Sequence, residues 1–390
     1  MKIYYDENMP FAAELFSPLG EVQSFAGRQC TAELIKDADV LLVRSITKVN
    51  ESLIKEAKNL KFVGTATIGT DHVDQEYLAQ RGICFTSAPG CNAISVAEYV
   101  LSAIKVLEQR YLFSLQDKTV GIVGAGNTGS RLSEKLDALG VNYLLCDPLL
   151  AAAGDNRTFV EYQQVLLEAD ILSFHVPLTA EGDYPTHHLF GEAQLAQVKS
   201  DAVIINACRG EVLDNLMLLK AKQNGNNNPL VLDVWAGEPA VLTDLVPFAD
   251  IATAHIAGYS FEGKARGTFM LYQALCKLLD KTAELSLERL LPPSDMTSIS
   301  LGNAGQSMVE GVTGSVKTPQ PDYDAINRVI HLIYDVRRDD AIFRQHIHKN
   351  GFDWIRKTYP VRREFSALAV FSQQQHTFNT LINLGFKRGE

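Results

Sequence analysis

The sequence lacks most of what a membrane, secreted or nucleic-acid-binding protein needs. It has no uninterrupted apolar run long enough to cross a bilayer, and its start, MKIYYDENMP, has no basic segment followed by an apolar one. The formal net charge of −10 disfavours a nucleic-acid surface. We therefore expect a cytoplasmic protein that binds neither nucleic acid nor membrane and that captures any anionic substrate with a local cluster of cations.

Metal-binding and disulfide patterns are also missing. The six cysteines contain no C-x-x-C pair, which argues against a disulfide framework and against a structural zinc site. Asp71 and Asp74 resemble a metal pair, but Asp71 equally suits a helix cap. Four histidines lie among solvated polar residues near the C-terminus, where a structural role is the better interpretation. We predict no metal. The four are His331, His346, His348 and His376.

The strongest positive signal is the segment TVGIVGAGNTG at 119–129. A β-branched apolar run enters three glycines at the G-x-G-x-x-G spacing of a dinucleotide-binding turn, and a helical pattern follows. A second strand, 141–146, ends at Asp147, whose carboxylate suits ribose hydroxyls and would repel a ribose phosphate. The predicted cofactor is therefore NAD rather than NADP. The residues expected to contact it here are Gly124, Gly126, Asn127, Thr128, Gly129 and Asp147.

The alternation of strands and helices predicts an α/β protein with two doubly wound domains, Rossmann-like or flavodoxin-like, and a cleft between them. The first, a substrate domain, is expected to comprise 1–91 and 259–290, because the apolar stripe of the helix 259–281 needs a partner face. The NAD-binding Rossmann domain should span 92–258. A change of composition after Pro293 indicates an appended α+β domain at 291–390.

Polar residues follow the predicted strands, and parallel sheets bind ligands beyond the carboxyl ends of their strands. In the first domain these residues are Arg44, Ser45 and Thr67, for which ordinary turn chemistry is the alternative.

In the second domain, Arg209, Glu238 and His255 follow three separate strands. Oxidation of a 2-hydroxy acid needs a cation for the carboxylate, which Arg209 offers as a planar fork. It also needs a base for the hydroxyl proton, which His255 can be with Glu238 orienting its ring. Each of these residues alone is more often a structural ion pair; together they predict a catalytic trio beside the nucleotide site.

Five motifs in order, VGAGNTG, HVPLT, INACRG, LDVWAGEP and TAHIAG, make residues 1–285 resemble the D-2-hydroxyacid dehydrogenases of the formate and phosphoglycerate dehydrogenase type. The resemblance implies NAD-dependent hydride transfer with His255 as the general acid or base. The irregular loop TAEGDYPTHHLF departs from the family pattern and leaves its cofactor contacts open. Further cofactor contacts implied by the resemblance are His175, Ala207, Cys208, Arg209, Asp233 and Gly258, and implied substrate contacts are Ser45, Thr67 and Tyr259.

Several segments, including SITKV and TATIGTDHVD, resemble one branch of the family that acts on a phosphorylated hydroxy acid and forms a homodimer through an extra C-terminal domain. The residues point the same way: 324–348 reads as one helix with a broad apolar side, the cleft is complete without the tail, and self-association would bury that side. The alternative is that the tail is a cap packed only on its own chain. For the function, two alternatives remain. One is a dehydrogenase for another phosphorylated 2-hydroxy acid such as 3-phosphoglycerate; the other is a non-catalytic NAD-sensing module like a corepressor.

Overall fold

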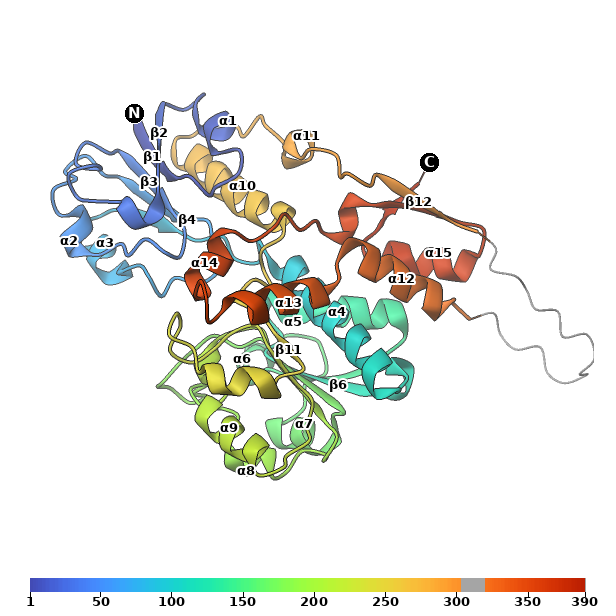
Figure 1. The fold of residues 1–390 in the computed structure, drawn as a ribbon. Coiled ribbons are helices and arrows are strands. Elements are labelled where there is room, and N and C mark those ends of the chain that lie inside the picture. The colour runs from blue at the N-terminus through green and yellow to red at the C-terminus, as the bar shows by residue number, and fades with distance from the viewer. Residues whose placement is uncertain (303–319, 390) are drawn as a thin grey trace, which may run out of the picture. The chain divides into compact units, whose positions relative to one another are not determined.

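The computed structural model of the protein describes residues 1–302 and 320–389 (Figure 1). The chain divides into two compact units, Met1–Ile94 with Tyr259–Pro292 and Ser95–Gly258 with Pro293–Glu390. Every sheet in the described residues is parallel, and helices connect the strands. The predicted α/β class with two doubly wound domains and a further C-terminal sheet is confirmed.

The first unit is built on a five-stranded parallel sheet in the order β2-β1-β3-β4-β5. Its central strands are apolar throughout, as VLLV of β3 shows, because both faces of a parallel sheet are covered. The strands are β1 Lys2–Asp6, β2 Glu21–Phe25, β3 Val40–Val43, β4 Phe62–Thr65 and β5 Cys84–Thr86. The helices are α1 Ala12–Phe16, α2 Glu51–Ile54, α3 Gln75–Gln80, α10 Phe261–Leu278 and α11 Leu287–Leu290.

Helix α10 comes from a distant part of the sequence but lies against this N-terminal sheet (Figure 1). Its buried residues Leu271 and Leu275 join a core with Val40, Leu42 and Phe62 of β3 and β4. Ser260 caps the start of the helix by accepting a hydrogen bond from the amide of Gly263, at 2.8 Å. The apolar stripe of α10 therefore completes the covering of the sheet.

The second unit holds a six-stranded parallel sheet in the order β11-β10-β9-β8-β6-β7. The chain order reverses between β6 and β8, and such a switch point is where doubly wound sheets bind nucleotides. The strands are β6 Thr119–Val123, β7 Asn142–Cys146, β8 Ile171–Phe174, β9 Val203–Asn206, β10 Leu230–Leu232 and β11 Ile251–Ala252. The helices are α4 Ala93–Tyr111, α5 Asn127–Leu139, α6 Pro148–Ala152, α7 Tyr162–Glu168, α8 Glu192–Leu195 and α9 Asn215–Gln223.

The described residues of the C-terminal segment of the second unit form a small parallel sheet and four α-helices. Its predicted single helix over 324–348 is wrong, because the chain leaves helical geometry at Tyr334 and Asp335 caps a new helix. The strands are β12 Ser298–Leu301, β13 Ala369–Ser372 and β14 Lys387–Arg388. The helices are α12 Tyr323–Ile333, α13 Val336–His346, α14 Phe352–Lys357 and α15 Gln375–Asn383.

The apolar side of α12 and α13 does not form the exposed patch from which self-association was predicted. Its residues Val329, Ile330, Val336 and Phe343 are buried inside the chain. Phe343 and Ile347 share one core with residues of the six-stranded sheet and with Phe352 and Ile355 of α14. That part of the sequence argument is wrong, because these side chains pack within their own chain, Phe343 and Ile347 among them against the nucleotide-binding sheet.

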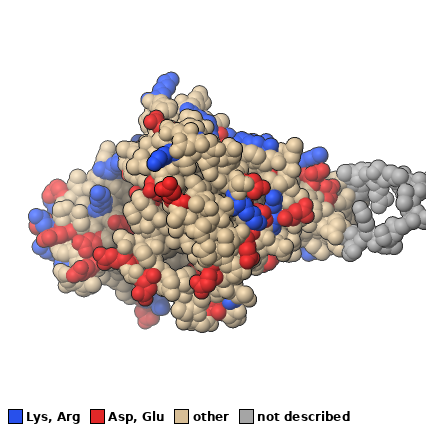
Figure 2. Space-filling view, turned by 90° about the horizontal axis from the view of Figure 1, so that it is seen from below, with Lys and Arg blue, Asp and Glu red and all other residues tan. Residues whose placement is uncertain are grey.

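Charged residues of both signs lie interspersed on the face that Figure 2 shows, rather than gathered by sign. This agrees with a net charge that is only moderately negative for 390 residues. Over the described residues, no helix combines the length and the apolar character that crossing a membrane requires. In the same residues, no three His, Cys, Asp or Glu side chains gather as metal ligands.

Candidate functional site

The glycine turn between β6 and α5 has the geometry that its sequence predicts. Gly124 has a φ of +92°, in the left-handed region that favours glycine. A Cβ on Gly129 would lie 2.1 Å from the carbonyl oxygen of Gly124, so α5 starts closer to the turn than any side chain allows. A Cβ on Gly126 would meet no atom within 4 Å. Open space therefore faces Gly126 at the start of α5, next to Asn127 and Thr128, where a pyrophosphate would fit.

Asp147 lies at the carboxyl end of β7, beside this turn. Its Oδ2 accepts a hydrogen bond from the amide of Ala125 at 2.9 Å, and its Oδ1 caps α6 by accepting from the amide of Leu150 at 3.1 Å. Each carboxylate oxygen keeps a second lone pair, so the residue can also accept from ribose hydroxyls. The side chain of Asp147 therefore lies beside the glycine turn, as a residue that contacts the cofactor at this turn would.

His175 follows β8 and adjoins the glycine turn, since its amide donates to the carbonyl of Val123 at 2.7 Å. Its Nε2 is 2.9 Å from the hydroxyl of Ser173, while its Nδ1 is buried and has no hydrogen-bond partner. Burial lowers the pKa of His175 to about 4, so the ring is neutral at neutral pH. A buried ring nitrogen without a partner suits a bound ligand, as expected of a cofactor contact.

His255 and Glu238 form a hydrogen-bonded pair, with 2.8 Å between Nδ1 and Oε2. Burial acts to raise the pKa of Glu238, but the charge and hydrogen bond of His255 outweigh it, so the pKa lies below its ordinary value. An ionised Glu238 accepts a hydrogen bond from the Nδ1–H group of His255, which leaves Nε2 for proton exchange. The other Glu238 oxygen accepts from the amide of Trp235 at 2.9 Å and fixes the carboxylate.

Asp233 organises the loop that carries His255. Its Oδ1 accepts from the hydroxyl of Thr253 at 2.7 Å and from the amide of Ile256 at 2.8 Å, while its Oδ2 accepts from the amide of Ala257 at 2.9 Å. The carboxylate of Asp233 is buried and fully engaged with this loop. A cofactor contact by Asp233, like that by Gly258 at the end of the loop, stays a prediction.

Arg209 follows β9 and lies in the loop next to Trp235. A Cβ on Gly210 would fall 1.9 Å from the carbonyl carbon of Trp235, so only glycine permits these two loops to approach. Asn206 shapes the turn between them, donating to the carbonyl of Arg209 at 2.9 Å and accepting from the amide of Cys208 at 3.2 Å. The loops of the predicted trio are therefore neighbours.

Ala207 and Cys208 form the turn before Arg209. Burial raises the pKa of Cys208 to about 11, so this residue is a neutral thiol at neutral pH. Its contribution to cofactor binding would then come from backbone and packing, not from a thiolate.

In the first unit, Ser45 and Thr67 lie beyond the carboxyl ends of two neighbouring strands, β3 and β4. Val43 and Thr65 are paired in register at the ends of β3 and β4, and each candidate lies two residues further on. Thr67 donates to the carbonyl of Gly69 at 2.9 Å and is half-buried, whereas Ser45 is exposed. Both residues therefore lie at the end of the sheet where open parallel sheets bind ligands.

Two further residues of the first unit bear on substrate binding. Arg44 precedes Ser45, and its Nη1 is buried with no hydrogen-bond partner in the described residues. Tyr259 lies just before α10, with the Nζ of Lys264 4.5 Å above its ring. The guanidinium of Arg44 is the group best suited to an anionic end of a ligand.

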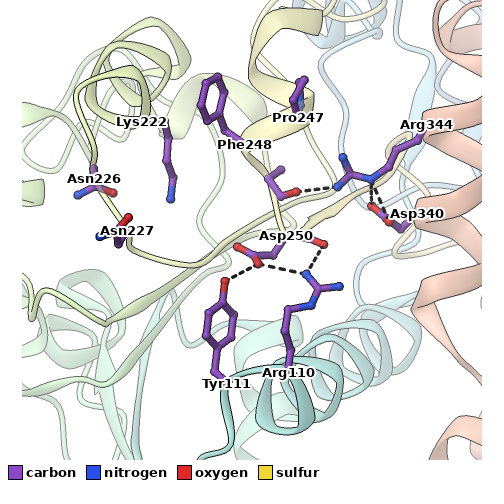
Figure 3. A pocket seen from close by; sticks show the side chains of 11 residues that line it. Arg110, Tyr111, Lys222, Asn226, Asn227, Pro247, Phe248, Asp250, Asp340 and Arg344 are labelled. Atoms are coloured by element: carbon purple, nitrogen blue, oxygen red, sulfur yellow. Dashed lines mark hydrogen bonds and ion pairs between the residues drawn. The ribbon is translucent and has the colours of Figure 1, made fainter.

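A pocket of about 590 Å³ in the second unit lies elsewhere (Figure 3). Asp250 precedes β11, so the pocket is at the amino-terminal end of that strand, opposite His255. Its cations are already engaged: Arg110 binds Asp250 at 3.1 Å and Arg344 binds Asp340 at 2.9 Å. This pocket does not belong to the predicted catalytic site.

Sequence reasoning missed Asn206 and Trp235, which hold the trio's loops, although both stand inside the quoted motifs. It also missed Arg362 in the C-terminal segment. Nothing local distinguishes a lone arginine 107 positions after His255, since only the fold brings them together.

Comparison with known proteins identifies the NAD binding domain. Residues 98–257 match the NAD binding domain of the D-isomer specific 2-hydroxyacid dehydrogenases, and residues 312–385 match a domain of unknown function, DUF3410. A crystal structure of D-lactate dehydrogenase from Aquifex aeolicus, complexed with NAD and lactic acid, superposes with a TM-score of 0.58 at 25% identity, covering 71% of this chain and 95% of that one. The fold and the matched NAD binding domain are those of a D-isomer specific 2-hydroxyacid dehydrogenase, which confirms the resemblance seen in the sequence.

Full-length relatives narrow the class. A protein from Tolumonas auensis named erythronate-4-phosphate dehydrogenase is 49% identical over 387 residues, 99% of each chain. One of the same name from Colwellia psychrerythraea is 50% identical over 409 aligned positions, covering 100% of both. The chain belongs to the erythronate-4-phosphate dehydrogenase family.

Proposed function

We propose that the protein catalyses the NAD-dependent oxidation of 4-phospho-D-erythronate to (R)-2-oxo-3-hydroxy-4-phosphobutanoate, a step in the biosynthesis of pyridoxine 5'-phosphate. The observation that carries the proposal is the 2.8 Å bond between His255 and Glu238, in a sheet whose glycine turn fits a dinucleotide. Full-length similarity to proteins named for this substrate supports the choice of 4-phosphoerythronate.

The reaction divides between the chain and its cofactor. NAD, when bound at the glycine turn, would supply the acceptor for the hydride that leaves C2 of the substrate. The Nε2 of His255 takes the proton of the C2 hydroxyl as the C=O bond forms, and Glu238 stabilises the imidazolium through Nδ1. Arg209 binds the carboxylate and the developing charge on the C2 oxygen. Arg44, Ser45, Thr67 and Tyr259 bind the rest of the substrate, with Arg44 suited to the phosphate.

A side-by-side turnover assay tests the substrate. With NAD in excess, kcat/KM should be at least 10²-fold greater for 4-phospho-D-erythronate than for 3-phosphoglycerate, because a site that hydrogen-bonds an additional hydroxyl rejects the analogue lacking it. Equal values would favour the wider class of phosphorylated 2-hydroxy acids. Absence of turnover with both, despite NAD binding, would favour the non-catalytic alternative.

Asp147 should set the choice of cofactor. NAD should bind far more tightly than NADP to the native protein, since a ribose phosphate would meet the carboxylate. Asp147→Ala should weaken the binding of NAD by about tenfold or more, the loss expected for hydrogen bonds to a charged group. The difference in affinity between NAD and NADP should therefore become smaller. Titrations of protein fluorescence with both cofactors measure this, and equal affinity of the native protein for both would contradict the assignment.

The homodimer and the cytoplasmic location also belong to the proposal. The resemblance suggests a dimer through the C-terminal domain, where Trp354 and Val361 remain exposed. Light scattering of the full chain should give about twice the monomer mass of 43.0 kDa; the monomer mass at micromolar concentration would refute the dimer. Six free cysteines suit a reducing compartment.

A further inference from the structure

His255 has a backbone conformation that its surroundings must enforce. Its φ is +55°, in the left-handed region that residues other than glycine seldom adopt. Such a conformation persists only where contacts hold the chain from more than one side, and it occurs often at functional sites. Asp233 supplies one side, through the amides of Ile256 and Ala257.

The C-terminal segment supplies the other side. Arg362 donates from Nη1 to the carbonyl of Ala257 at 2.9 Å and from Nη2 to the carbonyl of Ser95 at 2.6 Å. Ala257 is thus held through its amide by Asp233 and through its carbonyl by Arg362. The guanidinium carbon lies 3.5 Å from the centroid of the Tyr334 ring, which fixes the plane of the fork.

Arg362 is itself immobilised. It is 1% exposed, and its neighbour Glu364 accepts from the hydroxyl of Ser95 at 2.9 Å. The amide of Phe365 donates to the carboxylate of Glu98 at 3.2 Å. The 362–365 strip is therefore fastened to α4, and the arginine cannot move without breaking buried hydrogen bonds.

Two more contacts of the C-terminal segment support the chain near Glu238 and His255. The Oδ1 of Asp340 accepts from the amide of Ala252 at 2.8 Å, on the edge strand β11 that leads to His255, and Figure 3 shows Asp340 bound to Arg344. The ring of Phe343 stacks on Trp235 at 5.4 Å and 14°. Trp235 in turn donates to Glu238, so both members of the pair are supported from the C-terminal segment.

A buried arginine is weak evidence for stability alone, since well-packed apolar residues often stabilise a core as well. We propose that Arg362 is a positioning residue for hydride transfer: it holds the His255 loop through the carbonyl of Ala257, and 336–365 thereby forms part of the catalytic framework. This assigns a role to the DUF3410 segment besides any in dimerisation. The inference rests on the proposed function for its kinetic readout, although its structural readout does not.

The test compares Arg362→Met with Arg362→Lys and with Leu381→Ala. Leu381 is fully buried in α15 but is not among the core residues that surround Trp235, so it controls for loss of stability alone. Arg362→Met should lower kcat about tenfold and leave the dissociation constant of NAD within twofold. Arg362→Lys, which can donate to one carbonyl, should lie between it and the native protein. Leu381→Ala should keep kcat within twofold.

Nuclear magnetic resonance separates this inference from the proposed function. The low-field ring proton of the His255–Glu238 hydrogen bond, assigned by its loss in His255→Ala, should broaden in Arg362→Met and remain in Leu381→Ala, whether or not a substrate is turned over. An unchanged resonance, or a fall in kcat no greater than that of Leu381→Ala, would overturn the positioning role. If Arg362→Met does not fold, Phe343→Leu replaces it: a reduced kcat supports the role of the segment, and native values overturn it.

Discussion

Replacing His255 with alanine should lower kcat by about 10²- to 10⁴-fold, the range expected for loss of a positioned general base. NAD binding should stay within twofold of native, because the glycine turn and Asp147 lie at the ends of other strands. Steady-state formation of NADH gives kcat, and a fluorescence titration gives the dissociation constant of NAD.

Glu238→Gln is the matched variant. The side-chain amide oxygen of this glutamine can still accept a hydrogen bond from Nδ1–H of His255, but the glutamine has no charge to stabilise the imidazolium. We therefore expect kcat to fall, but less than in His255→Ala. A His255→Ala protein with near-native turnover would show that another group removes the proton.

Replacing Arg209 should mainly impair substrate binding. Arg209→Met removes a charged hydrogen-bonding group whose loss is worth ~1.5–3 kcal/mol, which corresponds to a KM for substrate raised by about 10- to 100-fold. Arg209→Lys keeps the charge but not the planar fork, so its KM should be raised less. Both variants should retain NAD affinity.

Substrate saturation curves distinguish this role from a structural one. The side chain donates to the carbonyl of Cys208 at 2.8 Å, so a structural arginine would disturb the turn and the NAD site together. If the NAD dissociation constant rose as much as the KM for substrate, Arg209 would be a support of the loop and not the carboxylate ligand.

Much of the fold could be predicted from local sequence patterns, because parallel strands that are buried on both faces are apolar throughout. The helix predicted to follow the glycine turn begins at Asn127 and ends at Leu139, where Gly140 adopts the left-handed conformation of a helix cap. Near the predicted domain boundary at residue 92, helix α4 begins at Ala93 and ends at Tyr111. Local chemistry specified these ends.

The pairing of His255 with Glu238 could also be predicted from the sequence, since the two residues follow adjacent strands of one sheet. What local patterns did not show was where the C-terminal segment packs. The apolar side of 324–348 is the same whether it faces a second copy or its own sheet, and only tertiary structure places Phe343 on Trp235. The loops that carry Arg362 and Ala257 have no shared sequence pattern from which their contact could be predicted.

Transfer of deuterium from C2 of the substrate is the most direct test of the proposed chemistry. The native protein would be incubated with NAD and 4-phospho-D-erythronate labelled with deuterium at C2, and the mass of the NADH formed would be measured. Hydride transfer beside His255 predicts one deuterium in each NADH. NADH without deuterium, or no NADH from a protein that binds NAD, would contradict it.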